Sequence, residues 1–404
     1  MKVIEFYQLK LKSPSKRIFV ARRRRINLPP QLIIFIIMSA PVQNSSSVAS
    51  LPRAKRGARS RCCSLLCLLV ISLFTPIYFY AQTDSLKIDS TSVEALSVKK
   101  DPIVIFSDIQ PVRKADHFFL TPEQKRKRQW LIGGLNVVGY GVSIIIFNNT
   151  WYKDYPKTSF HVFDDSKEWL QMDKVGHGWA AYNAGRASAA MWRWAGVSPK
   201  KAAWIGGLSS TAYLTMIEIL DGHSAKWGWS WADMAANVLG SGLFIGQQLG
   251  WEEQRIQLKF SFHLKSYSDP MLNERSDDLF GSHWTERMLK DYNGQTYWLS
   301  ANLRSFFPQS NLPAWLNVAV GYGAEGMFGG FENKWEDEDS GSTIDRTDIK
   351  RYRQWFLAPD INFSKIKTNK KAVRVLFDVL DAFKFPTPSL ELSNGKFKVN
   401  AIHF

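Results

Sequence analysis

Between residues 120 and 250 the apolar positions recur at helical spacing, and turn-forming residues divide this pattern into segments. The first segment begins at Thr121 and Pro122, a capping residue followed by proline at the first helical position, and runs to about Phe147. Three further helices are expected near residues 165–194, 198–220 and 230–250, and the last two can divide at glycines. The pattern therefore predicts an antiparallel bundle of four to six apolar helices.

Beyond Trp251 the period changes from about 3.6 residues to 2, which is typical of strands. Apolar residues alternate with polar ones from Ile256 to Leu264, and Asn394-Gly395 is a favoured hairpin turn. The remaining strands are expected at 296–303, 316–322, 355–363, 390–392 and 397–403. An amphipathic helix is expected at 370–383 and an acidic loop at 332–350.

These patterns predict an α+β fold, with the helical bundle followed by an antiparallel β-rich part. The predicted division is a basic N-terminal extension with a signal peptide (1–81), a linker (82–115), a helical domain (116–252) and a β-rich region (253–404). The closing aromatic residue Phe404, after an alternating strand, is typical of outer-membrane proteins, but a sheet packed on the helices explains the pattern equally well.

Small residues at four-residue spacing predict close helix packing, in membrane helices and in soluble bundles alike. They are Ala181, Gly185, Ala189 and Gly242, Gly246, Gly250. Residues 130–147 are apolar and just long enough to cross a bilayer. The basic run 125–128 would then flank the outer side of the span, against the positive-inside rule. A helical part lying against a membrane, or tied to the outer membrane, fits better than an inner-membrane bundle.

The net charge of +16 does not indicate a nucleic-acid-binding protein, because the charge is concentrated at one end. Residues 1–81 carry a net charge of +13, which leaves +3 for the rest of the chain. No concentrated basic face remains to neutralise phosphates, so no nucleic-acid partner is predicted.

A basic stretch at 53–61, an apolar stretch at 65–74 and a cleavage point after Ala81 predict a secretory signal peptide. Nothing before Met38 indicates a folded element, so Met38 is a candidate start. All three cysteines lie within 62–67, so the mature chain would contain neither a disulfide nor a thiolate. An exported protein of the periplasm or outer membrane is expected.

Ionisable residues interrupt the apolar helices at spacings that place them on shared helix faces. The pairs on a shared face are Asp173 with His177, Glu218 with Asp221, and Asp233 with Asn237. An unpaired charge inside apolar helices costs several kcal/mol, so these groups are expected to pair across helices in a polar seam. In a catalytic interpretation His177 is a general base or metal ligand, and Asp173 orients it or joins Glu218 and Asp221 as an oxygen ligand. Lys174 would hold an anionic phosphate or carboxylate.

Each of these residues also has a structural interpretation. Ser230 and Asp233 nearly form a capping box, so Asp233 can simply satisfy helix-start amides. Asp173, Lys174 and His177 can form a local ion pair on a helix surface, and His223 is expected to be exposed. Glu218 lies in a strongly apolar run, which favours a buried carboxylate paired with His177 or Lys174.

The three-part motif resembles the YfiM-like family of predicted periplasmic lipoproteins, a domain of unknown function, and more distantly the VanZ-like membrane proteins. It consists of Asp173-Lys174-x-x-His177, Glu218-x-x-Asp221-Gly222 and Ser230-x-x-Asp233-x-x-x-Asn237-x-x-Gly240. The resemblance covers roughly residues 120–250, and 292–298 is similar to longer family members. It implies a periplasmic location and says little about activity. A convincing lipid-attachment motif around Cys67 is missing.

The sequence thus predicts an exported cell-envelope protein with a structural or binding role, associated with a membrane surface or the outer membrane. The alternative is an envelope hydrolase or transferase that acts on a lipid or glycan intermediate through the His177 and carboxylate site, and transport is a third class. No cofactor is predicted, and the sequence leaves a metal, protein partners and catalysis itself open.

Overall fold

The computed structural model describes residues 2–9, 18–25, 120–148, 152, 155–337 and 341–403. The chain divides into two compact units, 1–54 and 55–404. In the first, β1 (Lys2–Leu9) pairs antiparallel with β2 (Ile18–Arg25), in a stretch where the sequence indicated no folded element. The predicted signal peptide at 53–81 and the linker at 82–115 lie outside the described residues.

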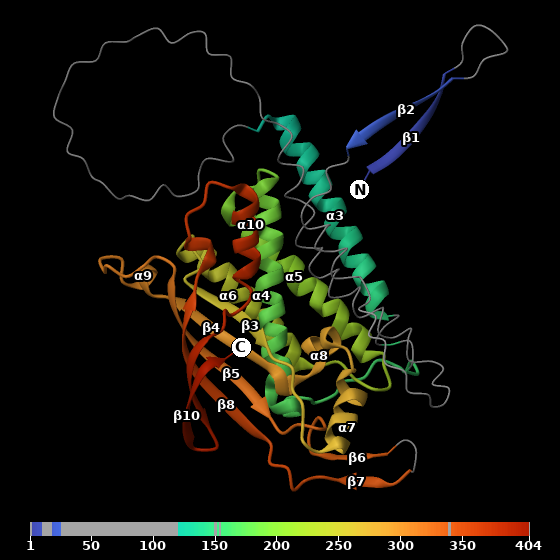
Figure 1. The fold of residues 1–404 in the computed structure, drawn as a ribbon, viewed down its shortest axis with the longest axis vertical. Coiled ribbons are helices and arrows are strands. Elements are labelled where there is room, and N and C mark those ends of the chain that lie inside the picture. The colour runs from blue at the N-terminus through green and yellow to red at the C-terminus, as the bar shows by residue number, and fades with distance from the viewer. Residues whose placement is uncertain are drawn as a thin grey trace. The chain divides into compact units, whose positions relative to one another are not determined.

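The four helices expected between residues 120 and 250 are present. They are α3 (Pro122–Phe147), α4 (Met172–Trp194), α5 (Pro199–Gly222) and α6 (Trp231–Gly250), with the short 3-10 helix η4 (Glu168–Gln171) before α4. Thr121 and Gln124 form a complete capping box at the start of α3. Helices α4, α5 and α6 pack against one another around Tyr182 and Phe244, whereas α3 packs on their edge through Ile132 (Figure 1).

Two glycines allow the helices to approach closely. A Cβ atom on Gly206 of α5 would lie 2.5 Å from the carbonyl oxygen of Gly185 on α4, and one on Gly240 of α6 would lie 2.1 Å from that of Gly178. The predicted small-residue stripe on α4 therefore faces its neighbours. The predicted stripe on α6, Gly242, Gly246 and Gly250, is not used for close helix packing, because a Cβ on any of these glycines would meet nothing within 4 Å.

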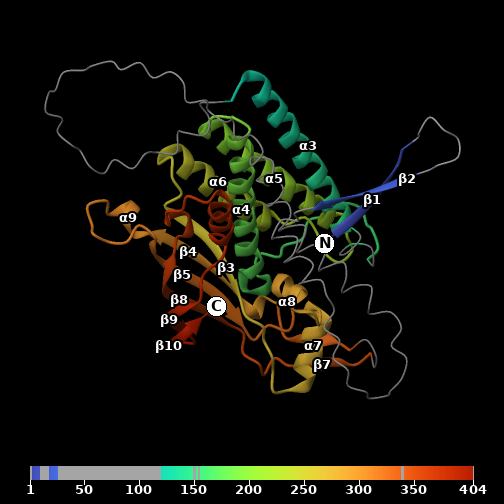
Figure 2. The same cartoon turned by 45° about the horizontal axis from the view of Figure 1, so that its top comes forward.

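The C-terminal part contains a six-stranded antiparallel sheet in the order β10-β9-β8-β5-β4-β3, and Figure 2 shows the strands following one another in that order. The strands are β3 (Ile256–Phe262), β4 (Gln295–Asn302), β5 (Leu316–Glu325), β8 (Tyr352–Ile361), β9 (Thr387–Ser393) and β10 (Lys396–His403). Every predicted strand is found, and the amphipathic helix is α10 (Lys371–Leu380). The α+β prediction is confirmed.

Several short elements differ from the expectation. The stretch 332–350 contains a hairpin of β6 (Lys334–Glu336) with β7 (Thr343–Asp345) instead of a plain loop. Helices α7 (Pro270–Phe280), α8 (Trp284–Lys290) and α9 (Leu303–Phe306) were not expected. The 3-10 turns η5 (Tyr292–Gly294) and η6 (Phe363–Lys365) complete this part.

The sheet packs on α4 through β3 and β4. Asn183 of α4 donates to the Leu258 carbonyl on β3 at 3.0 Å, and Met172 packs with Phe260 and Tyr297 in one core cluster. The polar side of β3 is also buried: Lys259 is fully enclosed and lies 2.8 Å from Asp360. Strand β3 is therefore covered on both faces. The contacts of Asn183 and Met172 hold the sheet against α4.

The apolar stretch 130–147, predicted to be just long enough for a membrane span, does not meet that requirement. None of the helices in the described part of the chain combines the length and the apolar character needed to cross a membrane.

Candidate functional site

Ionisable and amide side chains from three helices and one loop meet in a single group, which we call the Asp173 cluster. Its members are Asp165, Asp173, Lys174, His177, Glu218, Asp233 and Asn237. Asp173 and Asp233 lie in the first turns of α4 and α6, where the positive end of a helix favours a carboxylate. Glu218 lies near the end of α5, which runs antiparallel to both.

Lys174 is the central cation of the cluster. Its ammonium nitrogen lies 2.5 Å from Asp165, 3.0 Å from Asp173 and 2.9 Å from Asp233. Three carboxylates of the chain thus surround the group for which the sequence suggested an external phosphate or carboxylate. The side chain is 10% exposed, so this is a mostly buried ion-pair network and not the exposed pair of the alternative interpretation.

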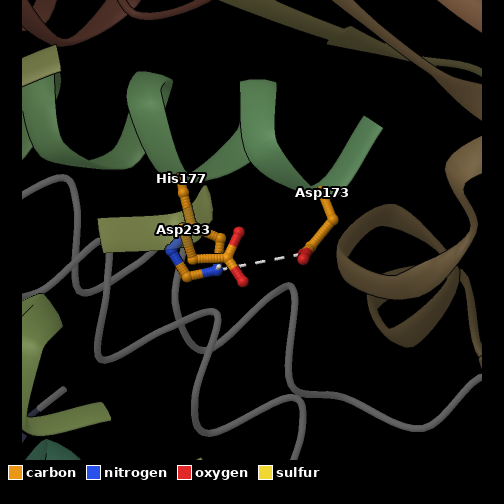
Figure 3. Close-up of side chains that lie close together, drawn as sticks. All are labelled: Asp173, His177 and Asp233. Atoms are coloured by element: carbon orange, nitrogen blue, oxygen red, sulfur yellow. Dashed lines mark ion pairs between the residues drawn. The ribbon is translucent and has the colours of Figure 1, made fainter. Parts of the chain in front are cut away.

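His177 lies one helical turn after Asp173, and its two ring nitrogens face different groups. Nε2 lies 3.9 Å from Asp173 and 4.0 Å from Asp233, and these three side chains point toward one another (Figure 3). Nδ1 lies 3.2 Å from the amide oxygen of Asn237 and 3.7 Å from Glu218. The imidazole is therefore placed between two carboxylates on one side and an amide and a carboxyl group on the other.

Glu218 is buried, as the sequence predicted, and lies beside His177. It also accepts the backbone N–H of Ser230 at 3.4 Å, while the Ser230 hydroxyl caps the N–H of Asp233 at 3.0 Å. In a capping box the side chain of Asp233 would accept that Ser230 N–H; here Glu218 takes that position and Asp233 turns to Lys174. Cap and cluster thus share Ser230, which also donates to Asp165 at 2.5 Å.

Two residues singled out in the sequence lie elsewhere. The Asp221 carboxylate accepts a hydrogen bond from the Tyr152 hydroxyl at 2.8 Å, and no contact joins it to His177 in the described residues. His223 is exposed and lies 3.3 Å from the Thr158 carbonyl. Asp221 is therefore not a member of the cluster, and His223 follows the expectation of an exposed residue.

Two further contributors to the cluster were not predicted. Asp165 comes from the loop before α4, and Tyr292 of η5 donates its hydroxyl to Asp173 at 2.7 Å. Burial raises the pKa of Tyr292 well above its usual value, and the neighbouring Asp173 adds to this, so the phenol stays protonated. Neither contact is indicated by a local sequence pattern, because the tertiary fold brings each residue to the cluster.

The loop that leads into α4 is held in an unusual conformation. Trp169, Leu170 and Gln171 have positive φ angles of 48°, 51° and 65°. The Trp169 N–H donates to the Gly330 carbonyl at 2.8 Å, and the hydroxyl of Tyr322 donates to the Leu170 carbonyl. Contacts from the C-terminal part thus fix the entry to the helix that carries Asp173 and His177.

Four carboxyl groups share two cationic side chains in the cluster, and the pKa values of Glu218, Asp233, His177 and Asp173 are shifted. Burial raises the pKa of Glu218 to about 8 and, together with the charge of Asp173, that of Asp233 to about 6. Burial opposes the charged form of His177, but Asp173, Asp233 and Glu218 outweigh it and raise its pKa to about 9. The pKa of Asp173 is lowered despite burial, because His177 and Lys174 stabilise its charge. Protonation of Glu218 below about pH 8 therefore reduces the carboxylate charge that the two cations balance.

The fold defines an α+β protein, and a comparison with known families matches part of its helical region. A family of predicted periplasmic lipoproteins, a domain of unknown function (DUF2279), matches residues 162–245. The matched segment includes every member of the Asp173 cluster and excludes Tyr292. Neither the curated proteins nor the solved structures provide a match.

The family match confirms the expected location, an exported and membrane-associated protein of the periplasm. It supports the resemblance to predicted periplasmic lipoproteins, but it does not distinguish YfiM-like from VanZ-like proteins and gives no information about the outer membrane. The comparisons supply no support for the alternative of an envelope hydrolase or transferase.

Proposed function

We propose that the protein is a structural or binding component of the cell envelope, with its helical part lying against a membrane and its helices fixed by the Asp173 cluster. The observation that carries this proposal is the apolar character of the outward faces of α3, α5 and α6. Their exposed large apolar side chains are Trp130, Leu131, Val137, Val138, Val142 and Ile145 on α3, Trp204, Ile205, Leu208 and Met216 on α5, and Trp231, Val238 and Leu239 on α6. The sheet also exposes apolar side chains, among them Phe397, Val399 and Ile402 on β10. Those on α3, α5 and α6 lie on neighbouring helices, and an exposed apolar surface of this kind is typical of a partner or membrane surface.

The charge at one end of these helices favours a membrane over a protein partner. The start of α3 lies beside the end of α4, since Arg128 donates to the Trp194 carbonyl at 3.3 Å. Helix α5 begins five residues after Trp194 and carries Lys200 and Lys201. Basic residues 125–128 therefore lie near these two lysines, and each Lys or Arg near an anionic lipid surface contributes ~1 kcal/mol. Basic groups beside exposed tryptophans suit the headgroup region.

The Asp173 cluster has a structural role in this proposal. It joins the first turns of α4 and α6 to the end of α5 through Lys174, His177 and Glu218. Separating the partners of a buried ion pair leaves uncompensated charges. A shift of one helix along the others would separate these groups, so the cluster favours one alignment of the helices. The YfiM-like assignment belongs to the same proposal, because the three-part motif supplies the residues that meet here.

Vesicle flotation tests the proposal with the full chain. Val137 of α3 and Val399 of β10 are 75% and 78% exposed, which makes them a matched pair on different parts of the protein. Val137→Asp should weaken binding to vesicles that contain anionic lipid by about tenfold or more, since aspartate enters lipid far less readily than valine. Val399→Asp should bind like the unmodified protein. Equal binding of both variants would show that α3 does not face lipid.

A further inference from the structure

We infer that Asp173, His177 and Asp233 form a binding site for one divalent transition-metal cation, of the class of Zn²⁺ or Mn²⁺. This inference goes beyond the structural role proposed for the cluster, since a network of internal ion pairs needs no ion from outside. It rests on the geometry of three ligand atoms and on the groups that hold them in place.

The three ligand atoms are His177 Nε2 and one carboxylate oxygen each from Asp173 and Asp233. All lie within 4.8 Å of one another, and Nε2 lies 3.9 and 4.0 Å from the two oxygens (Figure 3). Atoms about 4 Å apart can share a central cation with bonds of about 2.3 Å, and small side-chain movements shorten these to about 2.0–2.2 Å. The arrangement thus needs little change to accept an ion.

Lys174 holds both carboxylates in place. It donates to Oδ2 of Asp173 and to Oδ2 of Asp233 and also lies 2.9 Å from Oδ1 of Asp233, whereas the oxygens nearest to His177 Nε2 are the Oδ1 atoms. The ammonium group therefore leaves Oδ1 of Asp173 directed at the imidazole, while Oδ1 of Asp233 lies between the ammonium group and the imidazole. Tyr292 donates to Asp173 Oδ1 at 2.7 Å, which fixes that oxygen further and still leaves it a lone pair.

The second nitrogen of His177 is held in the way that metal-binding histidines usually are. Nδ1 lies 3.2 Å from Asn237 Oδ1 and 3.7 Å from Glu218 Oε1, so its N–H points at two acceptors. A bound cation would displace the proton on Nε2, whose lone pair then faces Asp173 and Asp233 while Nδ1 keeps its N–H. Asn237 and Glu218 are thus positioning residues for the ligand.

The Asp233 carboxylate is buried beside the imidazole. It is 4% exposed, and its Oδ1 lies 4.0 Å from His177 Nε2 and 2.9 Å from the Lys174 ammonium nitrogen. A bound cation would therefore share this oxygen with Lys174. Asp173 and His177 are 25% and 20% exposed at their side chains, so an ion can reach the site from solvent.

The ligand types select the class of ion. One imidazole nitrogen with two carboxylate oxygens suits Zn²⁺ or Mn²⁺ better than Ca²⁺, which prefers six to eight oxygens. Three protein ligands leave coordination positions for water.

Metal binding to untagged full-length protein tests the inference. After treatment with a chelator, equilibrium dialysis against Zn²⁺ and Mn²⁺ with elemental analysis should give one ion per chain. His177→Gln and Asp233→Asn should each weaken binding by at least about tenfold. The matched controls His223→Gln and Asp221→Asn change a histidine and an aspartate outside the cluster and should bind like the unmodified protein.

Absence of saturable binding, or undiminished binding by His177→Gln, would overturn the inference. If His177→Gln does not fold, the visible absorption of the unmodified protein with Co²⁺ decides instead: bands of nitrogen and oxygen coordination support the site, and the spectrum of the hydrated ion refutes it. Vesicle flotation without added metal is a separate readout, so failure of metal binding leaves the membrane proposal standing.

Discussion

Gly240 allows the closest approach between α4 and α6, and Gly240→Ala should separate the two helices. The added Cβ would lie 2.1 Å from the Gly178 carbonyl oxygen and 3.0 Å from the Ala181 Cβ, and neither group is the flexible end of a side chain. The helices must therefore move apart. Because Asn237 lies one turn before Gly240 and contacts His177, this movement also disturbs the Asp173 cluster.

The magnitude follows from two opposing effects. Alanine in place of glycine within a helix stabilises by about 0.5–1 kcal/mol through backbone entropy. Overpacking costs about 1–3 kcal/mol, and backbone on the opposing side puts this site at the upper end. We expect Gly240→Ala to lower the free energy of unfolding by about 2 kcal/mol. Gly242→Ala, two residues further along α6, meets nothing within 4 Å and should raise it by up to about 1 kcal/mol.

Urea unfolding followed by far-ultraviolet circular dichroism measures both variants against the unmodified protein. The two substitutions add the same methyl group to the same helix, so helix propensity cancels in their difference and the close approach remains. If Gly240→Ala were as stable as Gly242→Ala, α4 and α6 would not approach each other as closely as described, and the account of the cluster would lose its basis.

Two further predictions concern buried charge. Lys174→Met should cost about 3–5 kcal/mol in urea unfolding, because it leaves three carboxylates without their cation, whereas Lys201→Met at an exposed site of α5 should change stability by less than about 0.5 kcal/mol; equal effects would contradict a buried network. Burial lowers the pKa values of His263 and His403 to about 4, so stability should be complete above about pH 6.5 and fall toward pH 4 as the unfolded chain takes up protons first. His403→Phe, with a ring that can still pack on Phe356, should flatten this fall in the urea midpoint, and an unchanged slope would show that His403 is not buried in its neutral form.

The sequence predicted the elements whose burial produces a period. Helix α6 and strand β3 each bury a regular set of positions, and both were found close to their expected bounds. Helices α7 and α8 were missed because they are short and mixed in composition, although Asp269 and His283 cap their starts. The burial of Lys259 was also hidden, since alternation identifies a strand without showing what covers its polar side.

The same distinction holds for the candidate site. Asp173 and His177 share a helix face by geometry alone, and a carboxylate in an apolar run such as Glu218 is expected to find a partner. Tyr292 lies 119 residues from Asp173, and only the packing of the sheet on α4 brings it there. Asp221 was expected in the cluster because its spacing from Glu218 places both on one helix face. Its carboxylate instead accepts a hydrogen bond from Tyr152, which lies between α3 and α4.

The left-handed turn at Trp169, Leu170 and Gln171 has a consequence for any shortened form of the protein. Each such residue costs about 1–3 kcal/mol, and the hydrogen bonds that hold the turn come from Gly330, Tyr322 and Arg353, all far downstream of the family-matched stretch. A fragment cut at residues 162–245 would lack these restraints. Its turn would relax to an ordinary backbone, and the first turn of α4 would move Lys174 and His177 away from Asp233 and Glu218. The family-matched stretch thus depends, for its geometry, on residues that lie outside the match.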